Sequence, residues 1–471
     1  MLYLGFRPER ALPLIFLGFT VFALCFQGSF YLFEYRNGGT LAPTYFKLLK
    51  DAGFVVALSL IIWTGLTQKH RADALPLGNL FLISFCFLVT LTKLIEWTTY
   101  GNANILLLTV KNLVLYAAIV PALSMVSEDI KDLIVKRVMI AFAAVAFAQI
   151  IFSAALFVFF HERAFWTDDP YNGFSPFVGL FSNPNRFALF LNLAATALCA
   201  VLVTSITRFA LLAATGLIVI SISIFYTAAL SQLIVYFGLL FYATALTAIR
   251  MRWRSLRLLG VAAASVIAIG LVGITFKSPF PDESHKEAAL AWDLRNLASL
   301  AISGKTSDGA PFKFTSDSFV NRAREISNLM ESFGLHSMWP SNVPITTETG
   351  TRRPLHQKLF GVPEHMAPAS QSQFAYIYFR YGLLGLALFA GALLIPAISG
   401  LLLLFRSSDP LLLSYHLCLV AFIATFLGDN GLLDFPTNFL LFFVIFANQH
   451  LAPFRFRKPA IVFAVAGQSR I

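Results

Sequence analysis

The stretch LLAATGLIVISISIF (residues 211–225) decides the fold class of this chain. It is apolar almost throughout, and it lacks the regular alternation of polar and apolar side chains that strands of a membrane β-barrel show. Lipid cannot satisfy unpaired backbone groups, so such a run crosses a bilayer as a helix. The sequence therefore predicts an all-α membrane protein.

Similar apolar runs recur along almost the whole chain. Hydrophobic residues make up 58% of the sequence and charged residues 13%, whereas a soluble protein carries about 25% charged residues. A membrane-spanning helix needs about 20 apolar residues. We expect about twelve spans, at residues 12–33, 52–67, 77–95, 103–126, 133–160, 184–206, 209–225, 229–249, 256–276, 373–404, 410–428 and 432–451.

The net charge of +11 indicates orientation rather than nucleic-acid binding. Lys and Arg concentrate in alternate connectors between the apolar runs, as the positive-inside rule expects of cytoplasmic loops. We expect a multi-pass protein of the bacterial inner membrane with both termini in the cytoplasm. The four cysteines lie within apolar runs and show no metal-ligand spacing, so we expect no disulfide, metal or cofactor.

The expected spans divide the chain into three regions. Residues 1–276 hold the first nine helices, residues 277–372 form one large periplasmic loop, and residues 373–471 hold three more helices and a cytoplasmic tail. The loop mixes apolar and charged residues, and helices are expected within it at 285–303 and 318–334. The two halves of the chain show no repeat, which disfavours a transporter.

Two phrases carry a family resemblance. GLFSNPNRFALFL (179–191) leads into the sixth span, and SQSQFAYIYFRYGLLG (370–385) opens the tenth. Together with the long loop between late helices, they resemble the superfamily of O-antigen ligases and O-antigen polymerases. This resemblance implies a GT-C-like fold and a metal-independent, inverting glycosyltransferase that uses undecaprenyl-diphosphate-linked glycan.

The resemblance is incomplete at two positions. The ligase signature has a His, a small polar residue, nine residues and then Gly-x-x-Gly, and here Gln371 replaces the His before Ser372. An Arg that the family carries at the start of a middle span is replaced by Gln232. The missing His favours a polymerase over a ligase.

Arginines are the expected substrate-binding residues, because a guanidinium binds phosphate oxygens with two hydrogen bonds and stays charged. Arg186 opens a helix, where the macrodipole also favours an anion, although it could equally be a snorkelling anchor. Arg380 lies about two turns into an apolar span, where a charge faces a cavity or a partner. The remaining candidates for substrate binding are Arg322, Arg324, Asn185 and Gln371.

A glycosyl transfer also needs a base for the acceptor hydroxyl, and Glu325, His336 and His365 are the candidates. Lys111, inside the fourth span, either pairs with a carboxylate or snorkels to one end. We expect periplasmic polymerisation of lipid-linked oligosaccharide units, with membrane lipids and other polysaccharide assembly proteins as partners. The alternatives are a ligase that transfers glycan to lipid A-core or another acceptor, a transporter or flippase of lipid-linked saccharide, and a non-catalytic assembly partner.

Overall fold

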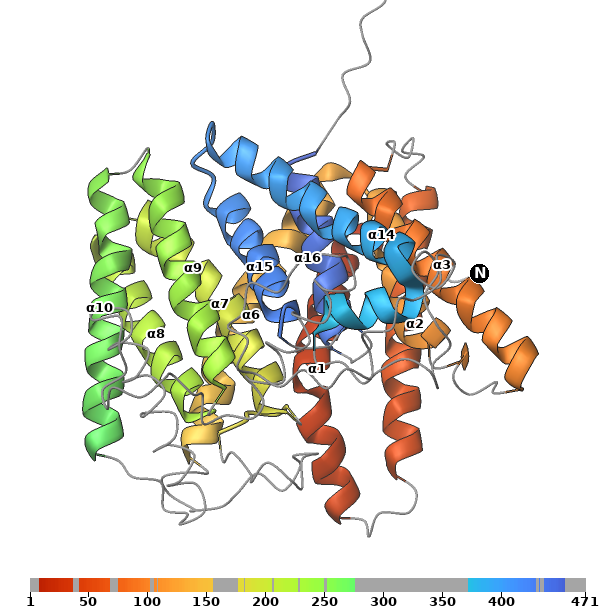
Figure 1. Cartoon of the computed structure of the whole chain (residues 1–471), viewed down its shortest axis with the longest axis horizontal. Coiled ribbons are helices and arrows are strands. Elements are labelled where there is room, and N and C mark those ends of the chain that lie inside the picture. The colour runs from red at the N-terminus through yellow and green to blue at the C-terminus, as the bar shows by residue number, and fades with distance from the viewer. Residues whose placement is uncertain are drawn as a thin grey trace, which may run out of the picture.

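The computed structural model is helical throughout its described part, in which there is no strand. It describes residues 8–36, 42–67, 75–101, 106–107, 109–155, 177–181, 183–205, 207–227, 229–249, 252–275, 372–428, 432 and 436–453. The helices are α1 (Pro8–Arg36), α2 (Ala42–Thr67), α3 (Leu77–Tyr100), the π-helix η1 (Val110–Leu115), α5 (Ile119–Ser124), α6 (Glu128–Ala155), α7 (Pro184–Thr204), α8 (Thr207–Tyr226), α9 (Leu230–Ala248), α10 (Arg252–Thr275), α14 (Gln373–Leu404), α15 (Pro410–Phe426) and α16 (Thr437–Leu451) (Figure 1).

The predicted fold class is confirmed. Among the described residues, 8 helices are long and apolar enough to cross a membrane. Shorter apolar helical segments lie at Ala11–Cys25, Val110–Ser124, Pro410–Phe426 and Thr437–Leu451. With the longer helices they coincide with the twelve predicted spans, so the chain is an all-α, multi-pass membrane protein.

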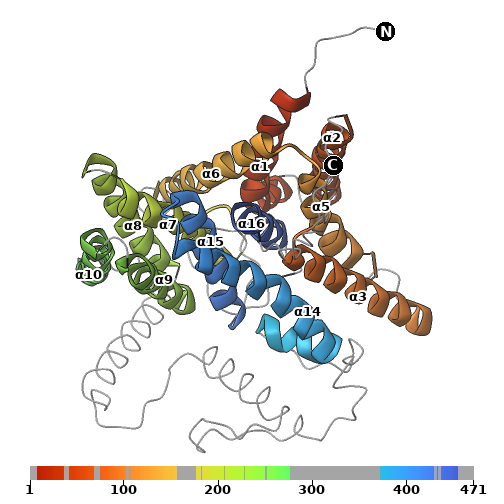
Figure 2. The same cartoon turned by 90° about the horizontal axis from the view of Figure 1, so that it is seen from above.

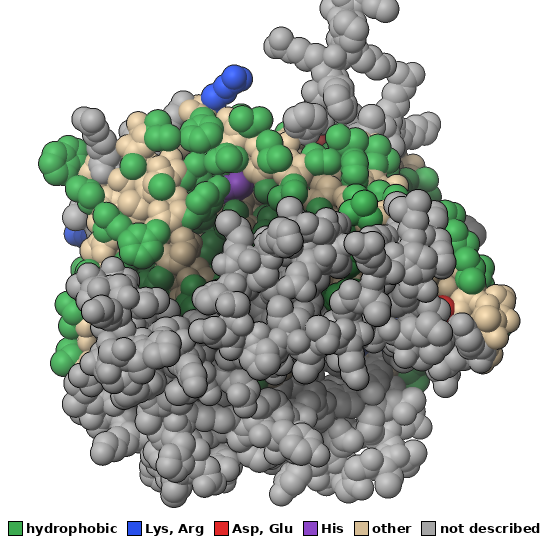
Figure 3. Space-filling view, viewed as in Figure 1, with side chains coloured by type: hydrophobic (Ala, Val, Ile, Leu, Met, Phe, Trp, Pro, Cys, Tyr) green, Lys and Arg blue, Asp and Glu red, His purple; other side chains and the backbone are tan. Residues whose placement is uncertain are grey.

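The side chains agree with a lipid environment. Large apolar residues such as Phe87, Ile151 and Leu211 are about two-thirds exposed although they lie on long helices. On the face seen in Figure 3 the described side chains are mostly hydrophobic, with few charges among them. In water such a surface would aggregate, whereas lipid tails cover it without cost.

The helix α16 lies in the middle of the bundle. Every residue from Thr437 to Gln449 is buried, and the view from above places α16 among α1, α5, α14 and α15 (Figure 2). Its aromatic side chains pack against those of α1, as in the edge-on contact of Phe19 with Phe439 at 5.2 Å between ring centroids. A helix that is apolar on all sides is suited to this position.

Two spans differ from expectation: the fourth is divided, and the second begins earlier. The fourth is divided into η1 and α5 by a turn at Ala118, and Pro121 follows three residues later within α5. The helix α2 begins at Ala42 rather than near residue 52. Lys50 and Asp51, which interrupt the apolar pattern there, are paired with each other at 3.3 Å.

Close packing of α14 on α3 provides a test of the fold. A Cβ atom added at Gly391 would overlap the ring of Phe81, whereas one added at Gly260 of α10 would meet nothing. We therefore expect Gly391→Val to destabilise the protein by about 1–3 kcal/mol, the usual effect of overpacking. Thermal unfolding in detergent measures this, with Gly260→Val as the matched control. Equal unfolding temperatures for the two variants would contradict the packing of α3 on α14.

Candidate functional site

Arg186 is positioned by the start of α7. Asn183 caps the helix, since its side-chain oxygen accepts a hydrogen bond from the backbone N–H of Asn185 at 2.8 Å. Pro184 follows as the first helical residue, where its fixed φ is suited to a helix and its missing N–H is not needed. The sequence Asn-Pro-Asn-Arg thus places Arg186 in the first turn, at the positive end of the helix dipole.

The side chain of Arg186 turns into the protein. Arg186 is only 9% exposed. Its Nη1 donates a hydrogen bond to Oγ1 of Thr437, the first residue of α16, at 3.3 Å. A snorkelling anchor would instead extend along the lipid to the headgroups. The buried position favours the functional interpretation of Arg186 over the anchor. Asn185, its predicted companion, is partly exposed.

Arg380 is also directed inward, as predicted for a charge within an apolar span. It is 6% exposed, and its guanidinium carbon lies 5.3 Å from the ring centroid of Tyr376, one turn earlier on α14. Such a cation–π contact stabilises a charge where water is scarce. Two residues later the helix is interrupted at Gly382, whose φ of 65° and ψ of −166° suit glycine alone.

The starts of three helices meet at one end of the bundle. Ser372 caps α14 and donates from Oγ to the carbonyl of Phe426, at the end of α15, at 3.3 Å. Gln373 accepts at Oε1 from the backbone N–H of Leu432, in the turn before α16, at 2.9 Å. Because Arg186 joins the starts of α7 and α16, these four helices share one end of the bundle, which we call the loop end.

A row of polar groups continues across the loop end from α7 to α2. Beside Thr437, the side-chain amide of Asn438 donates to the carbonyl of Asn112 in η1. Lys111, the neighbour of Asn112, pairs with Asp51 of α2 at 2.6 Å between Nζ and Oδ2. Pairing with a carboxylate, one of the two alternatives expected for Lys111, is therefore confirmed. We call this set the polar row: Arg186, Thr437, Asn438, Asn112, Lys111 and Asp51.

The other predicted site residues cannot be placed relative to this row. Outside the described residues lie the expected loop helices 285–303 and 318–334 and the candidates Gln371, Arg322, Arg324, Glu325, His336 and His365. Within the described part of the chain, no three His, Cys, Asp or Glu residues are grouped closely enough to hold a metal ion.

A buried polar cluster was missed from the sequence. Asn192 of α7 donates to Oε1 of Gln232 at 3.0 Å, and Gln232 pairs with the hydroxyl of Thr425 on α15 at 3.3 Å. Gln232, on α9, thus joins three helices. Asn192, a polar residue inside an apolar run, was the signal that could have revealed this cluster.

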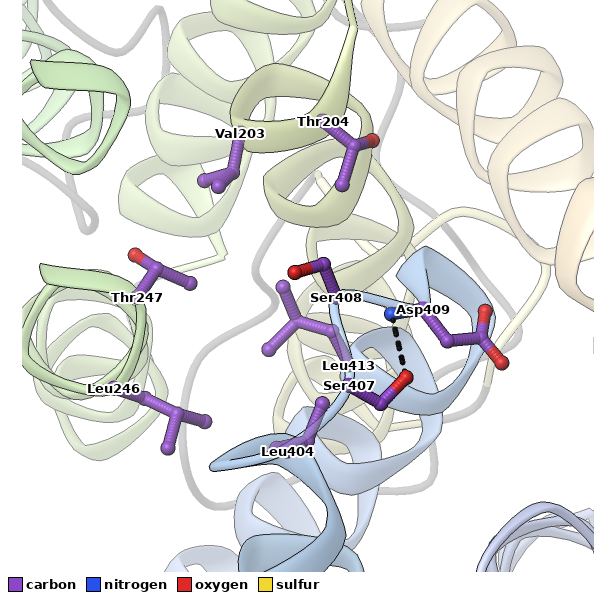
Figure 4. Close-up of a pocket in the computed structure, with 9 residues that line it drawn as sticks. All are labelled: Val203, Thr204, Leu246, Thr247, Leu404, Ser407, Ser408, Asp409 and Leu413. Atoms are coloured by element: carbon purple, nitrogen blue, oxygen red, sulfur yellow. Dashed lines mark hydrogen bonds between the residues drawn. The ribbon is translucent and has the colours of Figure 1, made fainter. Parts of the chain in front are cut away.

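A recess with an empty volume of about 340 Å³ lies at the opposite end of the bundle. Thr204 at its wall and Arg186 are at the two ends of α7, about 27 Å apart by helical rise. The backbone N–H of Asp409 donates to Oγ of Ser407 there, at 3.2 Å. The recess is thus separate from the arginines, and Figure 4 shows its lining residues: Val203, Thr204, Leu246, Thr247, Leu404, Ser407, Ser408, Asp409 and Leu413.

The cluster around Gln232 makes a prediction about stability. Gln232→Leu leaves the side chains of Asn192 and Thr425 without this hydrogen-bonding group in an apolar interior, which should cost about 1–3 kcal/mol. The double variant Asn192→Leu, Gln232→Leu should lose less than the sum of the two single variants, because it removes both partners. Thermal unfolding in detergent measures both, with Ser231→Ala on the same helix as the control. Additive losses would show that the two side chains do not interact.

Comparisons with known proteins leave the family of this chain open. No protein-family model matches the sequence, and no curated protein matches it. The features that bear on its function are two buried arginines and the polar row, at the end of the bundle where α7, α14 and α16 begin.

Proposed function

We propose that this protein is a bacterial inner-membrane glycosyltransferase that polymerises undecaprenyl-diphosphate-linked oligosaccharide repeat units on the periplasmic face. The observation that carries the proposal is the burial of Arg186 and Arg380 in helices that begin at the same end of the bundle. In sequence, residues 276–371 lie between α10 and α14, and α14 begins at this end. The proposal places this end in the periplasm and both termini in the cytoplasm.

The proposed reaction needs cations that keep their positive charge in a membrane. The acceptor hydroxyl oxygen attacks the anomeric carbon of the donor sugar from the side opposite the diphosphate. The bond between that carbon and the diphosphate oxygen breaks, and its electron pair leaves with the diphosphate. Guanidinium groups are suited to neutralise this charge, because they remain protonated and bind phosphate oxygens in pairs.

The start of α7 adds to the attraction for an anion. Its first backbone N–H groups lack helical acceptors, and the helix dipole places partial positive charge beside Arg186. Thr437 orients the guanidinium from α16, while Tyr376 faces that of Arg380. We assign Arg186 and Arg380 to the donor diphosphate. Asn185, which precedes Arg186, and Gln371, which precedes the cap of α14, are further proposed contacts to the substrate.

The acceptor proton needs a base from another part of the chain. Glu325, His336 and His365 are the proposed bases, and Arg322 and Arg324 are further proposed contacts to the substrate. Membrane lipids surround the enzyme in this proposal, and other polysaccharide assembly proteins work beside it. The missing family His at Gln371 favours polymerisation over ligation to lipid A-core.

The arginines can be tested in cells through glycan chain length. In a deletion strain, Arg186→Gln or Arg380→Gln should leave single repeat units where wild-type protein gives long chains. Loss of one charged hydrogen-bonding group should lower the rate by at least about tenfold. Glycan gels with membrane abundance checked for each variant make the measurement, and the exposed Arg406 provides the control Arg406→Gln.

Two other results would change the assignment. Long glycan chains that accumulate in the deletion strain without being attached to an acceptor would indicate a ligase. Unchanged glycan in the deletion strain itself would reject the glycosyltransferase and favour transport of a lipid-linked saccharide.

A further inference from the structure

Lys111 is a charged residue that the proposed reaction leaves without a role. It lies in η1, a π-helix, which is a rare conformation that occurs often at functional sites. Its side chain is 29% exposed, whereas that of Lys50 is 6% exposed. Of these two lysines, Lys111 therefore has the more accessible side chain.

The counter-ion of Lys111 is shared. Asp51 also pairs with Lys50 at 3.3 Å and accepts a hydrogen bond from the hydroxyl of Tyr116 at 3.2 Å. One carboxylate thus serves two ammonium groups and a phenol. Only part of its negative charge is available to Lys111, whose ammonium carries three N–H donors.

Lys111 is also connected to the arginine site. Its neighbour Asn112 accepts from Asn438, and the adjacent Thr437 accepts from Arg186. Two hydrogen bonds and one peptide link therefore join the guanidinium to the backbone of η1 at Asn112, and a second peptide link leads to Lys111. The polar row brings a further cation, Lys111, to the loop end from a different part of the fold.

We propose that Lys111 binds a phosphate group of a membrane-embedded lipid, next to the arginine site. The phosphate supplies the negative charge that Asp51 shares among its donors, and it reaches Lys111 from the exposed part of the side chain. Two sources have this chemistry, a phospholipid headgroup and the diphosphate of an undecaprenyl-linked donor. The inference deepens the proposed function. Only the second source, the undecaprenyl-linked donor, depends on that function.

The test measures lipid binding to the full chain. Protein purified in detergent is stripped of lipid and titrated, by native mass spectrometry, with undecaprenyl diphosphate, phosphatidylglycerol or the phosphate-free diacylglycerol. Wild type should bind at least one phosphate lipid more tightly than diacylglycerol. Lys111→Gln should weaken that binding by about tenfold, and Lys111→Arg should retain it.

A matched control is available at the start of α6. Lys131 pairs with Glu128 at 2.8 Å and is 7% exposed at its side chain, so Lys131→Gln removes a paired lysine elsewhere. It should leave phosphate-lipid binding unchanged. Weakening for undecaprenyl diphosphate alone would identify the donor as the ligand, whereas weakening for phosphatidylglycerol as well would identify a phospholipid headgroup.

A second variant separates binding from a purely structural ion pair. Asp51→Asn keeps the ammonium of Lys111 and removes the carboxylate that competes for it, so phosphate-lipid binding should tighten. If Lys111→Gln does not fold, the lipid binding of Asp51→Asn decides whether the inference holds. Unchanged binding in Asp51→Asn, or in a folded Lys111→Gln, would overturn the inference. Because phosphatidylglycerol is one of the probes, a normal glycan in the deletion strain would reject the enzyme without rejecting this site.

Discussion

The hydrogen bond from Arg186 to Thr437 is the interaction on which the arrangement of the loop end depends. It joins the first turn of α7 to the first residue of α16, the helix that is buried on every side. A charge that is withdrawn from water is costly, and it usually faces a cavity or a partner. Arg186 at the start of α7 and Arg380 about two turns into α14 are both buried, and this cost is the physical reason for assigning them a function rather than a packing role.

The surrounding polar groups satisfy the backbone at the helix starts. The starts of α7 and α14 are capped by Asn183 and Ser372, and Gln373 holds the turn before α16. Each of these contacts satisfies backbone groups that lipid could not. The same contacts fix the helix starts against one another, so that both arginines lie on rigid elements instead of on loops.

Much of this architecture could be predicted from hydropathy, because lipid allows so few backbone conformations. The runs at 184–206 and 373–404 correspond closely to α7 and α14. The inward direction of Arg380 followed from the cost of a charge in an apolar span. Hydropathy alone could not find the pairing of Lys111 with Asp51, the division of the fourth span near Ala118, or the cluster around Gln232. These depend on which helices become neighbours, and residues as distant as Gln232 and Thr425 meet only in the folded bundle.

The central claim is that the diphosphate of a lipid-linked saccharide binds at the loop end. The most direct measurement is an electron cryomicroscopy structure of the full chain in a lipid nanodisc with an undecaprenyl-diphosphate-linked oligosaccharide. Density for the diphosphate within hydrogen-bonding distance of Arg186 and Arg380 is the predicted result. Density for the diphosphate in the recess beside Thr247 and Ser407, at the other end of the bundle, would contradict the claim.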